Sequence, residues 1–167
     1  METAGLQRPF RTFLALLFFR LLVASIVVIW SPHAILSTHP SETLGKLRFL
    51  PPIGVTLMTL GAIAYVRSAW DFAFGSRSFA PGSVVATGVY RFVRHPMYFG
   101  LVLILLGESG LFGSWILLGY TATIWVLLHL FVTIYEEPTL TKRLGEAYRT
   151  YCNLTPRWVP KIRSSKP

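Results

Sequence analysis

The stretch MYFGLVLILLGESGLF occupies residues 97–112, and WILLGYTATIWVLLHLFVTIY follows it at residues 115–135. Both are almost unbroken apolar runs, and a helix that spans a bilayer needs roughly 17 to 25 such residues. Two further apolar runs lie upstream, at residues 13–30 and 49–66. The pattern predicts an all-α, polytopic membrane helix bundle with about four transmembrane helices, of which the helix over 97–112 is marginal in length.

The composition of the whole chain supports this fold class. Hydrophobic residues make up 53% of the 167 residues, charged residues make up 14%, and the mean hydropathy is +0.53. A soluble domain of this length has too little interior to bury so much apolar surface. No internal repeat or strand-like alternation of useful length interrupts the pattern, so we expect one membrane-embedded domain over residues 1–167. The first run has no small-residue cleavage site after it, and we expect it to be retained.

The distribution of basic residues predicts the orientation of these helices. Thirteen of the sixteen Lys and Arg residues lie before the first span, between the second and third, or after the fourth. Because basic segments favour the cytoplasmic side, we expect both termini to be cytoplasmic, in a membrane of the bacterial inner-membrane type. The loop at 31–48, in which Pro, Ser and Thr break the helical periodicity, is expected to be external. Arg20 lies inside the first span, where it has a function or extends to a lipid phosphate.

The net charge of +9 does not indicate a nucleic-acid partner. Basic residues of the tail alternate with Tyr and Trp next to the last span, which is typical of a segment at the level of the lipid headgroups. We therefore expect anionic membrane lipids as the counter-charge, and we expect no metal site. The single cysteine, Cys152, excludes an internal disulfide and is interpreted as a packing residue. The sequence does not predict the oligomeric state.

The segment GVYRFVRHPMYFG at residues 88–100 carries the strongest chemical pattern. Pro96 is tolerated in the first turn of a helix, because its missing amide would be unpaired there in any case. Arg94 and His95 then flank a helix N-terminus, whose free amides favour an anionic group. We expect a carboxylate or phosphate to bind at this end, with a bidentate contact from Arg94. The alternative is that Arg94 binds a lipid phosphate while His95 caps the helix.

Two adjacent carboxylates, Glu136 and Glu137, end the fourth apolar run. Like charges side by side at the end of an apolar helix are unfavourable unless cations compensate them. The candidate cations are Arg94, Lys142, Arg143 and a bound ligand. The alternative is a solvated helix end.

Several other positions are interpreted as structural. We expect His129 to make a hydrogen bond between packed helices rather than to contact a cofactor. Glu108 is expected to cap or reverse the chain between the third and fourth spans. Gly54 and Gly61 place small residues on one face of the second span and predict close helix packing. Residues 70–89, rich in Gly, Ser and Ala, are expected to form an interfacial flap.

Four motifs, taken in order, resemble the integral-membrane isoprenylcysteine carboxyl methyltransferase and phospholipid methyltransferase superfamily. The likeness covers residues 82–160, which would form a motif-bearing catalytic core, whereas residues 1–69 match only in providing two spans. The motifs are Gly88-x-Tyr90-x-x-x-Arg94-His95-Pro96-x-Tyr98-x-Gly100, Glu136-Glu137-x-x-Leu140, Gly145-x-x-Tyr148-x-x-Tyr151 and Pro156-Arg157-Trp158-x-Pro160.

The resemblance implies methyl transfer from S-adenosylmethionine to a lipophilic acceptor at the cytoplasmic membrane face, with a cytoplasmic C-terminal segment that helps to bind the cofactor. It implies catalytic roles for Arg94 and Glu137. The implied cofactor-binding residues are Tyr90, His95, Pro96, Tyr98, Gly100, Glu136, Glu137 and Leu140, and the implied substrate-binding residues are Arg94, Tyr148, Tyr151, Arg157 and Trp158.

The acceptor itself stays open. Members that methylate prenylated cysteine usually have a basic residue two positions before the tail proline, where this chain has Leu154, and Arg157 is the candidate substitute. The resemblance therefore implies an acceptor that is an isoprenoid or alkyl carboxylate, a lipid amine or a thiol, and no general base is identifiable. Two alternatives are a non-catalytic membrane module that binds lipid or a partner helix, and a steroid-reductase-like NADPH enzyme. The G-x-G-x-x-G fingerprint of soluble dinucleotide enzymes is absent from the sequence.

Overall fold

The computed structural model describes residues 23–38, 48–74 and 88–159. These segments consist of helices and the turns that join them, with no strand in the part described. The helical fold class predicted from the sequence is thereby confirmed. The chain divides into two compact units, residues 1–41 and 42–167, and the single domain expected over residues 1–167 stays a prediction.

In the first unit, the described residues form one helix from Val23 to Thr38. A π-helical turn, η1 (Ile26–Trp30), leads into α2 (Ser31–Thr38), so the expectation of a loop from residue 31 onward was wrong for residues 31–38. The wider turn accommodates Pro32 without breaking the helix, because the Ser31 amide still reaches the Ile26 carbonyl oxygen. Arg20 and the first part of the predicted span, residues 13–22, lie outside the described residues.

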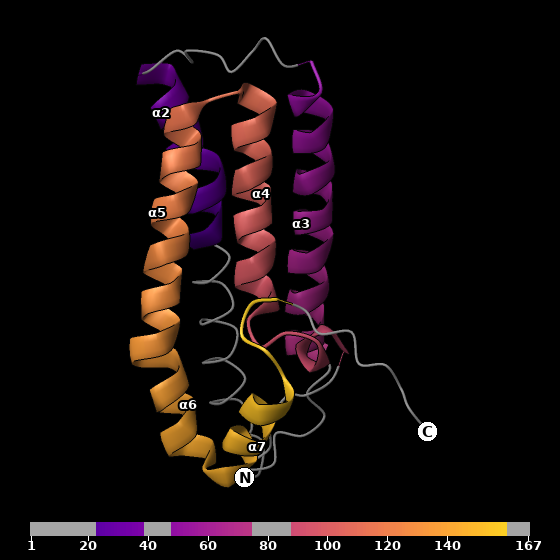
Figure 1. Cartoon of the computed structure of the whole chain (residues 1–167), viewed down its shortest axis with the longest axis vertical. Helices are drawn as coiled ribbons and strands as arrows, with labels where there is room; N and C mark the ends of the chain where they lie inside the picture. The colour runs from indigo at the N-terminus through magenta and orange to yellow at the C-terminus, as the bar shows by residue number, and fades with distance from the viewer. Residues whose placement is uncertain (1–22, 39–47, 75–87, 160–167) are drawn as a thin grey trace, which may run out of the picture. The chain divides into compact units, whose positions relative to one another are not determined.

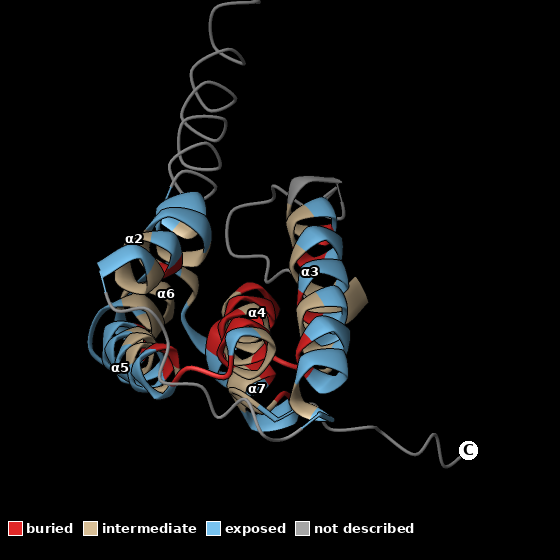
Figure 2. Cartoon of the chain, turned by 90° about the horizontal axis from the view of Figure 1, so that it is seen from above, coloured by how far each residue is buried: buried red, intermediate tan, exposed pale blue. Residues whose placement is uncertain are grey.

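In the second unit, the long helices lie side by side with α4 in the middle, as Figures 1 and 2 show. A second π-helical turn joins α5 to α6, so that one continuous helix runs from Trp115 to Leu144. In chain order the elements are α3 (Leu50–Phe74), η2 (Gly88–Arg91, a 3₁₀ turn), α4 (Pro96–Phe112), α5 (Trp115–Phe131), η3 (Val132–Glu136, the π turn), α6 (Glu137–Leu144) and α7 (Glu146–Leu154).

Two of the described helices are long and apolar enough to cross a membrane, namely Leu50–Phe72 and Trp115–Leu144. Only 11% and 17% of their apolar windows are buried inside the protein. Large side chains such as Ile63, Trp125 and Ile134 are exposed on them, as is expected of a surface that faces lipid. The helix Val23–Thr38 and α4 are apolar but shorter, so the arrangement with four spans stays a prediction.

The core of the second unit lies along α4. Figure 2 shows buried residues gathered on this helix, while the outward faces of α3 and α5 are exposed. Facing glycines bring α3 against α4: a Cβ on Gly54 would lie 2.5 Å from the Gly107 carbonyl oxygen, and one on Gly61 would lie 2.6 Å from that of Gly100. The close helix packing predicted for Gly54 and Gly61 is confirmed.

A tight hairpin joins α4 to α5. Gly113 ends α4 with a φ of 58°, a left-handed conformation that costs glycine little. The Ser114 hydroxyl then accepts a hydrogen bond from the Leu117 amide at the start of α5. The expectation that Glu108 caps or reverses the chain was wrong, because Glu108 lies buried within α4 and the reversal comes five residues later.

Substituting alanine for Gly61 should destabilise the protein by about 1–3 kcal/mol, because the new Cβ would press on the backbone of α4. Thermal unfolding of the detergent-solubilised protein measures the effect. Gly119→Ala is the matched control, since a Cβ there meets no atom within 4 Å. That variant should be neutral or stabilising, because alanine favours a helix over glycine by up to about 1 kcal/mol. Equal midpoints for the two variants would contradict the close packing of α3 on α4.

Candidate functional site

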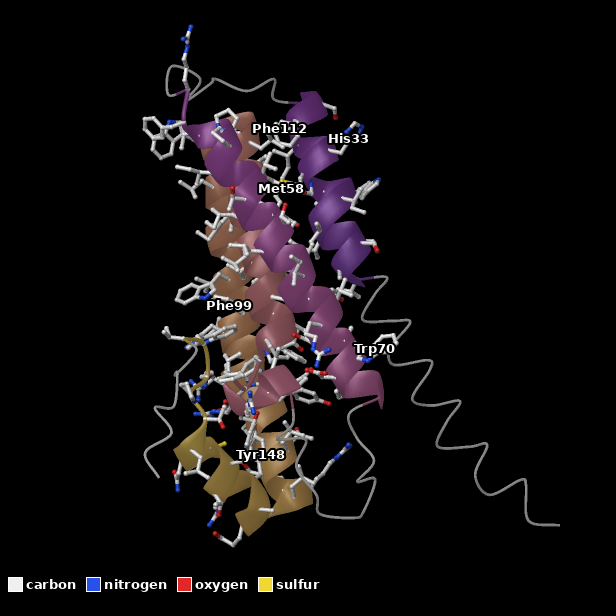
Figure 3. The ribbon with its side chains drawn as sticks, turned by 90° about the vertical axis from the view of Figure 1, so that its right-hand side faces the viewer. His33, Met58, Trp70, Phe99, Phe112 and Tyr148 are labelled. Carbon is white, nitrogen blue, oxygen red and sulfur yellow. The ribbon has the colours of Figure 1, made fainter. Side chains whose placement is uncertain are left out.

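The candidate site lies at the N-terminal end of α4. Pro96 is the first residue of this helix, as predicted, and Arg94 and His95 directly precede it. Figure 3 shows Tyr148 of α7 near this end of α4 and Phe112 at the opposite end. His95 is the N-cap residue of α4, and its carbonyl oxygen accepts a hydrogen bond from the Phe99 amide at 3.1 Å, but its side chain makes no capping hydrogen bond.

The Glu137 carboxylate lies at the centre of a network of ionic contacts. Its Oε1 accepts hydrogen bonds from Arg94 Nη1 at 2.8 Å and from Arg157 Nε at 2.9 Å, and its Oε2 accepts one from Arg157 Nη2 at 2.6 Å. The Glu137 side chain is only 13% exposed, which makes these charged hydrogen bonds stronger than surface pairs. Arg94 was among the cations predicted from the sequence, whereas Arg157 was not.

The His95 imidazole lies between the two glutamates. Its Nδ1 is 4.0 Å from Glu136 Oε1, its Nε2 is 3.5 Å from Glu137 Oε1, and the Tyr98 hydroxyl donates to Glu136 Oε2 at 3.0 Å. His95 is only 6% exposed, yet its Nε2 has no hydrogen bond of good geometry among the described residues. Buried polar atoms without a hydrogen bond are rare in proteins, so Nε2 is a candidate for contact with a ligand.

The π turn explains how both glutamates approach one ring. Successive residues of an α-helix diverge by about 100° around the axis, because a turn takes 3.6 residues. Here η3 widens the turn that ends at Glu136, just before Pro138, as η1 does before Pro32. In both places a proline lacks its amide, and the wider turn makes room for its ring. The helix that begins at Trp115 therefore continues to Leu144, and the expectation that it ends at the two glutamates was wrong.

The segment after α7, residues 155–159, folds back over the start of α4, and we call it the strap. The Arg94 amide donates to the Pro156 carbonyl oxygen at 2.9 Å, and Arg94 Nε donates to that of Thr155 at 2.7 Å. Trp158 Nε1 donates to His129 Nδ1 at 3.1 Å. His129 thus makes the hydrogen bond expected of it, but to the strap instead of to a packed helix.

The turn before α4 is anchored by Asp71, a residue that the sequence analysis missed. Its buried carboxylate accepts a hydrogen bond from the Val89 amide at 2.9 Å and pairs with Arg67 at 3.1 Å. Gly88 has a φ of 58° and leaves no room for a Cβ against this carboxylate. The detectable signal was an acidic residue at the end of an apolar span, which is costly unless it has a partner.

The same turn is held from the other side by α7. The Tyr151 hydroxyl donates to the Tyr90 carbonyl oxygen at 2.6 Å. Burial raises the pKa of Tyr151, so the phenol stays protonated and able to donate. Burial likewise raises the pKa of Tyr148, which packs beside it.

Cys152 Sγ accepts a hydrogen bond from Arg94 Nη1 at 3.3 Å, so this cysteine contacts the site as well as packing against it.

The remaining predicted residues lie near the site without adding to its polar contacts. Gly100 faces Gly61 of α3, where its lack of a side chain permits close packing. Leu140 lies in α6, one turn after Glu136.

The possible cations Lys142 and Arg143 form no ion pair with either glutamate in the described structure. In the described ranges, no group of three His, Cys, Asp or Glu side chains is placed to hold a metal ion. The expected flap, residues 70–89, lies largely outside the described residues.

Replacing Asp71 with alanine should destabilise the protein by about 1–3 kcal/mol, because the Val89 amide and Arg67 both lose their partner. Asp71→Asn keeps an oxygen for the amide and should cost less. Thermal unfolding and amide hydrogen exchange at Val89 report the change. Glu146→Gln removes an exposed ion pair with Arg149 and should have almost no effect. Unaltered exchange at Val89 in Asp71→Ala would show that Asp71 does not anchor the turn.

Comparison with known proteins places these residues in context. A family model described as phospholipid methyltransferase matches residues 48–147, which include Arg94, His95, Glu136 and Glu137 but not the strap. The protein-S-isoprenylcysteine O-methyltransferase of Schizosaccharomyces pombe is 31% identical over 80 residues. The match covers 47% of this chain and 34% of that protein, so the chain spans about a third of the length of this relative.

Proposed function

The chain belongs to the phospholipid methyltransferase family, and on that premise we propose that it is a membrane enzyme that transfers a methyl group from S-adenosylmethionine to a lipophilic acceptor. The observation that carries the proposal is the polar cluster formed by Arg94, His95, Glu136 and Glu137 beside apolar, exposed helices. The membrane helices would hold the acceptor, and the cluster would hold the cofactor.

The donor and acceptor groups of the cluster fit S-adenosylmethionine. Carboxylates at Glu136 and Glu137 suit an ammonium group and ribose hydroxyls, and the helix start beside Arg94 suits a carboxylate. The unpaired Nε2 of His95 offers a further buried contact. The other residues proposed to bind the cofactor are Tyr90, Pro96, Tyr98, Gly100 and Leu140.

Bound S-adenosylmethionine supplies a methyl group that is already activated on a sulfonium. The protein therefore has to align the acceptor and to exclude water. The strap, tied to Arg94, Glu137 and His129, covers the cluster and meets the second need. We propose that Arg94 orients an anionic group and that Glu137 fixes Arg94 in place. An amine acceptor would have to lose a proton, whereas a carboxylate or thiolate would not.

The acceptor would contact the residues of the strap and α7. Arg94, Tyr148, Tyr151, Arg157 and Trp158 are the proposed set, and the two tyrosines are buried where α7 packs. Arg157 is engaged in two hydrogen bonds with Glu137, so a substrate carboxylate would have to compete with that pair. The S. pombe relative is named for action on S-isoprenylcysteine. For this chain the proposed acceptor is an isoprenoid or alkyl carboxylate, a lipid amine or a thiol.

Purified protein should bind S-adenosylmethionine and S-adenosylhomocysteine in a calorimetric titration, and it should not bind NADPH. Glu137→Gln and His95→Ala should each weaken S-adenosylmethionine binding by about 1–3 kcal/mol, because a charged or buried contact is lost. Glu146→Gln, on the exposed face of α7, is the matched control. Thermal unfolding checks that each variant is folded. Unchanged affinity in both site variants would show that the cofactor binds elsewhere, and binding of NADPH alone would favour a reductase.

We further propose four spanning helices with both termini in the cytoplasm, on the basis of the basic-residue asymmetry. Single cysteines introduced at positions 42 and 164, in a variant that lacks Cys152, should react with a membrane-impermeant reagent from opposite sides. Position 42 lies in the first loop and position 164 lies in the tail. Reaction of both from the same side would overturn this topology.

A further inference from the structure

A series of rings connects the polar cluster to the lipid-facing side of α5. The centroid of the Trp158 ring is 6.1 Å from that of His95, 6.1 Å from that of His129 and 6.5 Å from that of Trp125. His95 is buried in the cluster, whereas Trp125 is 44% exposed on a helix long enough to span a membrane. Trp158 therefore stands between the polar site and the surface that faces lipid.

The orientation of the Trp158 ring is fixed by His129. Trp158 Nε1 donates to His129 Nδ1, because an indole nitrogen can only donate, and this hydrogen bond occupies the lone pair of Nδ1. His129 therefore acts on Trp158 as a positioning residue.

The neighbouring strap residue, Arg157, has a different partner. Its guanidinium binds Glu137 in the polar cluster, while the Trp158 indole binds α5. Glu137 and Trp125 are twelve residues apart on one continuous helix, which corresponds to about 18 Å along its axis. Because His129 and Trp158 are only partly buried, their rings offer apolar surface over part of that distance.

We propose that Trp158, held in place by His129, selects the acceptor by its apolar chain. The chain would pack along Trp158 and Trp125 on α5, and the reacting group would reach the cluster at His95. This inference rests on the proposed methyltransferase function and narrows it. The acceptor carries an extended apolar chain directly attached to its reacting group, and a small soluble thiol is a poor substrate.

The test compares long-chain and short-chain acceptors of the same chemistry. Full-length protein in lipid nanodiscs, supplied with S-adenosylmethionine, is given dodecanoate or butanoate, dodecylamine or butylamine, and dodecanethiol or butanethiol. The quantity measured is the ratio of kcat/KM for the long acceptor to that for the short one. Wild type should favour the long acceptor, and Trp158→Ala should lower the ratio roughly ten- to fiftyfold, since two or three methylene groups lose their contact with the ring.

Variants of His129 separate positioning from general stability. His129→Leu removes the acceptor for the indole N–H, whereas His129→Gln retains a side-chain oxygen that can accept it. Trp158→Phe removes the donor while keeping a ring. His129→Leu and Trp158→Phe should each lower the ratio several-fold, and the double variant should lower it no further, because both break one hydrogen bond. His129→Gln should recover most of the wild-type ratio.

A second measurement does not depend on turnover. Dodecanoate and dodecylamine that carry a diazirine on the chain should label the strap or α5 on irradiation, and His129→Leu should reduce the labelling. S-adenosylmethionine affinity, titrated in parallel, should be the same in all these variants. Failure of wild type to bind S-adenosylmethionine would overturn the proposed function itself. Normal cofactor binding with an unchanged ratio in the variants, or with labelling confined to other helices, would overturn only the role of Trp158 and His129.

Discussion

The contact on which the site depends is the Glu137 carboxylate shared by two guanidinium groups. Arg94 precedes Glu137 by 43 residues and Arg157 follows it by 20, so one side chain joins the start of α4, the start of α6 and the strap. All three side chains are largely removed from water. Loss of Glu137 would leave two partly buried guanidinium groups without their shared carboxylate, which costs far more than a surface ion pair is worth. Glu137 is therefore the residue that joins these three segments.

Glu137 can join these segments only because the turn before α4 has a fixed position. Asp71 of α3 and Tyr151 of α7 hold the turn before Arg94 through its backbone, from two different helices. The facing glycines bring α3 close enough for Asp71 to reach that turn. These contacts are to main-chain atoms, so they fix the backbone of the turn directly, and Gly88 leaves space for the Asp71 carboxylate. The close packing of two apolar helices, α3 and α4, therefore helps to set the position of the polar cluster.

The sequence predicted the features that depend on local pattern. The apolar runs predicted the helices, and Pro96 predicted where α4 begins. Arg94 was predicted as a partner for the glutamates because a carboxylate at the end of an apolar run needs a compensating cation, and it does pair with Glu137. The strap could not be predicted in this way, because residues 155–159 have no helical or strand periodicity and their partners lie far away in the chain. The π turns were not predicted, because a regular α-helix with 3.6 residues per turn was assumed throughout. Pro32 and Pro138, which each follow a π turn by two residues, were the available signal.

The strap also explains how a polar site can border directly on lipid. Two consecutive residues of the strap have partners on different elements, because Arg157 binds Glu137 at the start of α6 while Trp158 binds His129 on α5. One short segment thus presents a charged face to the cluster and an aromatic face to the apolar helices. Such a boundary is what methyl transfer between a water-soluble donor and a lipophilic acceptor would require, because the two reactants come from different solvents.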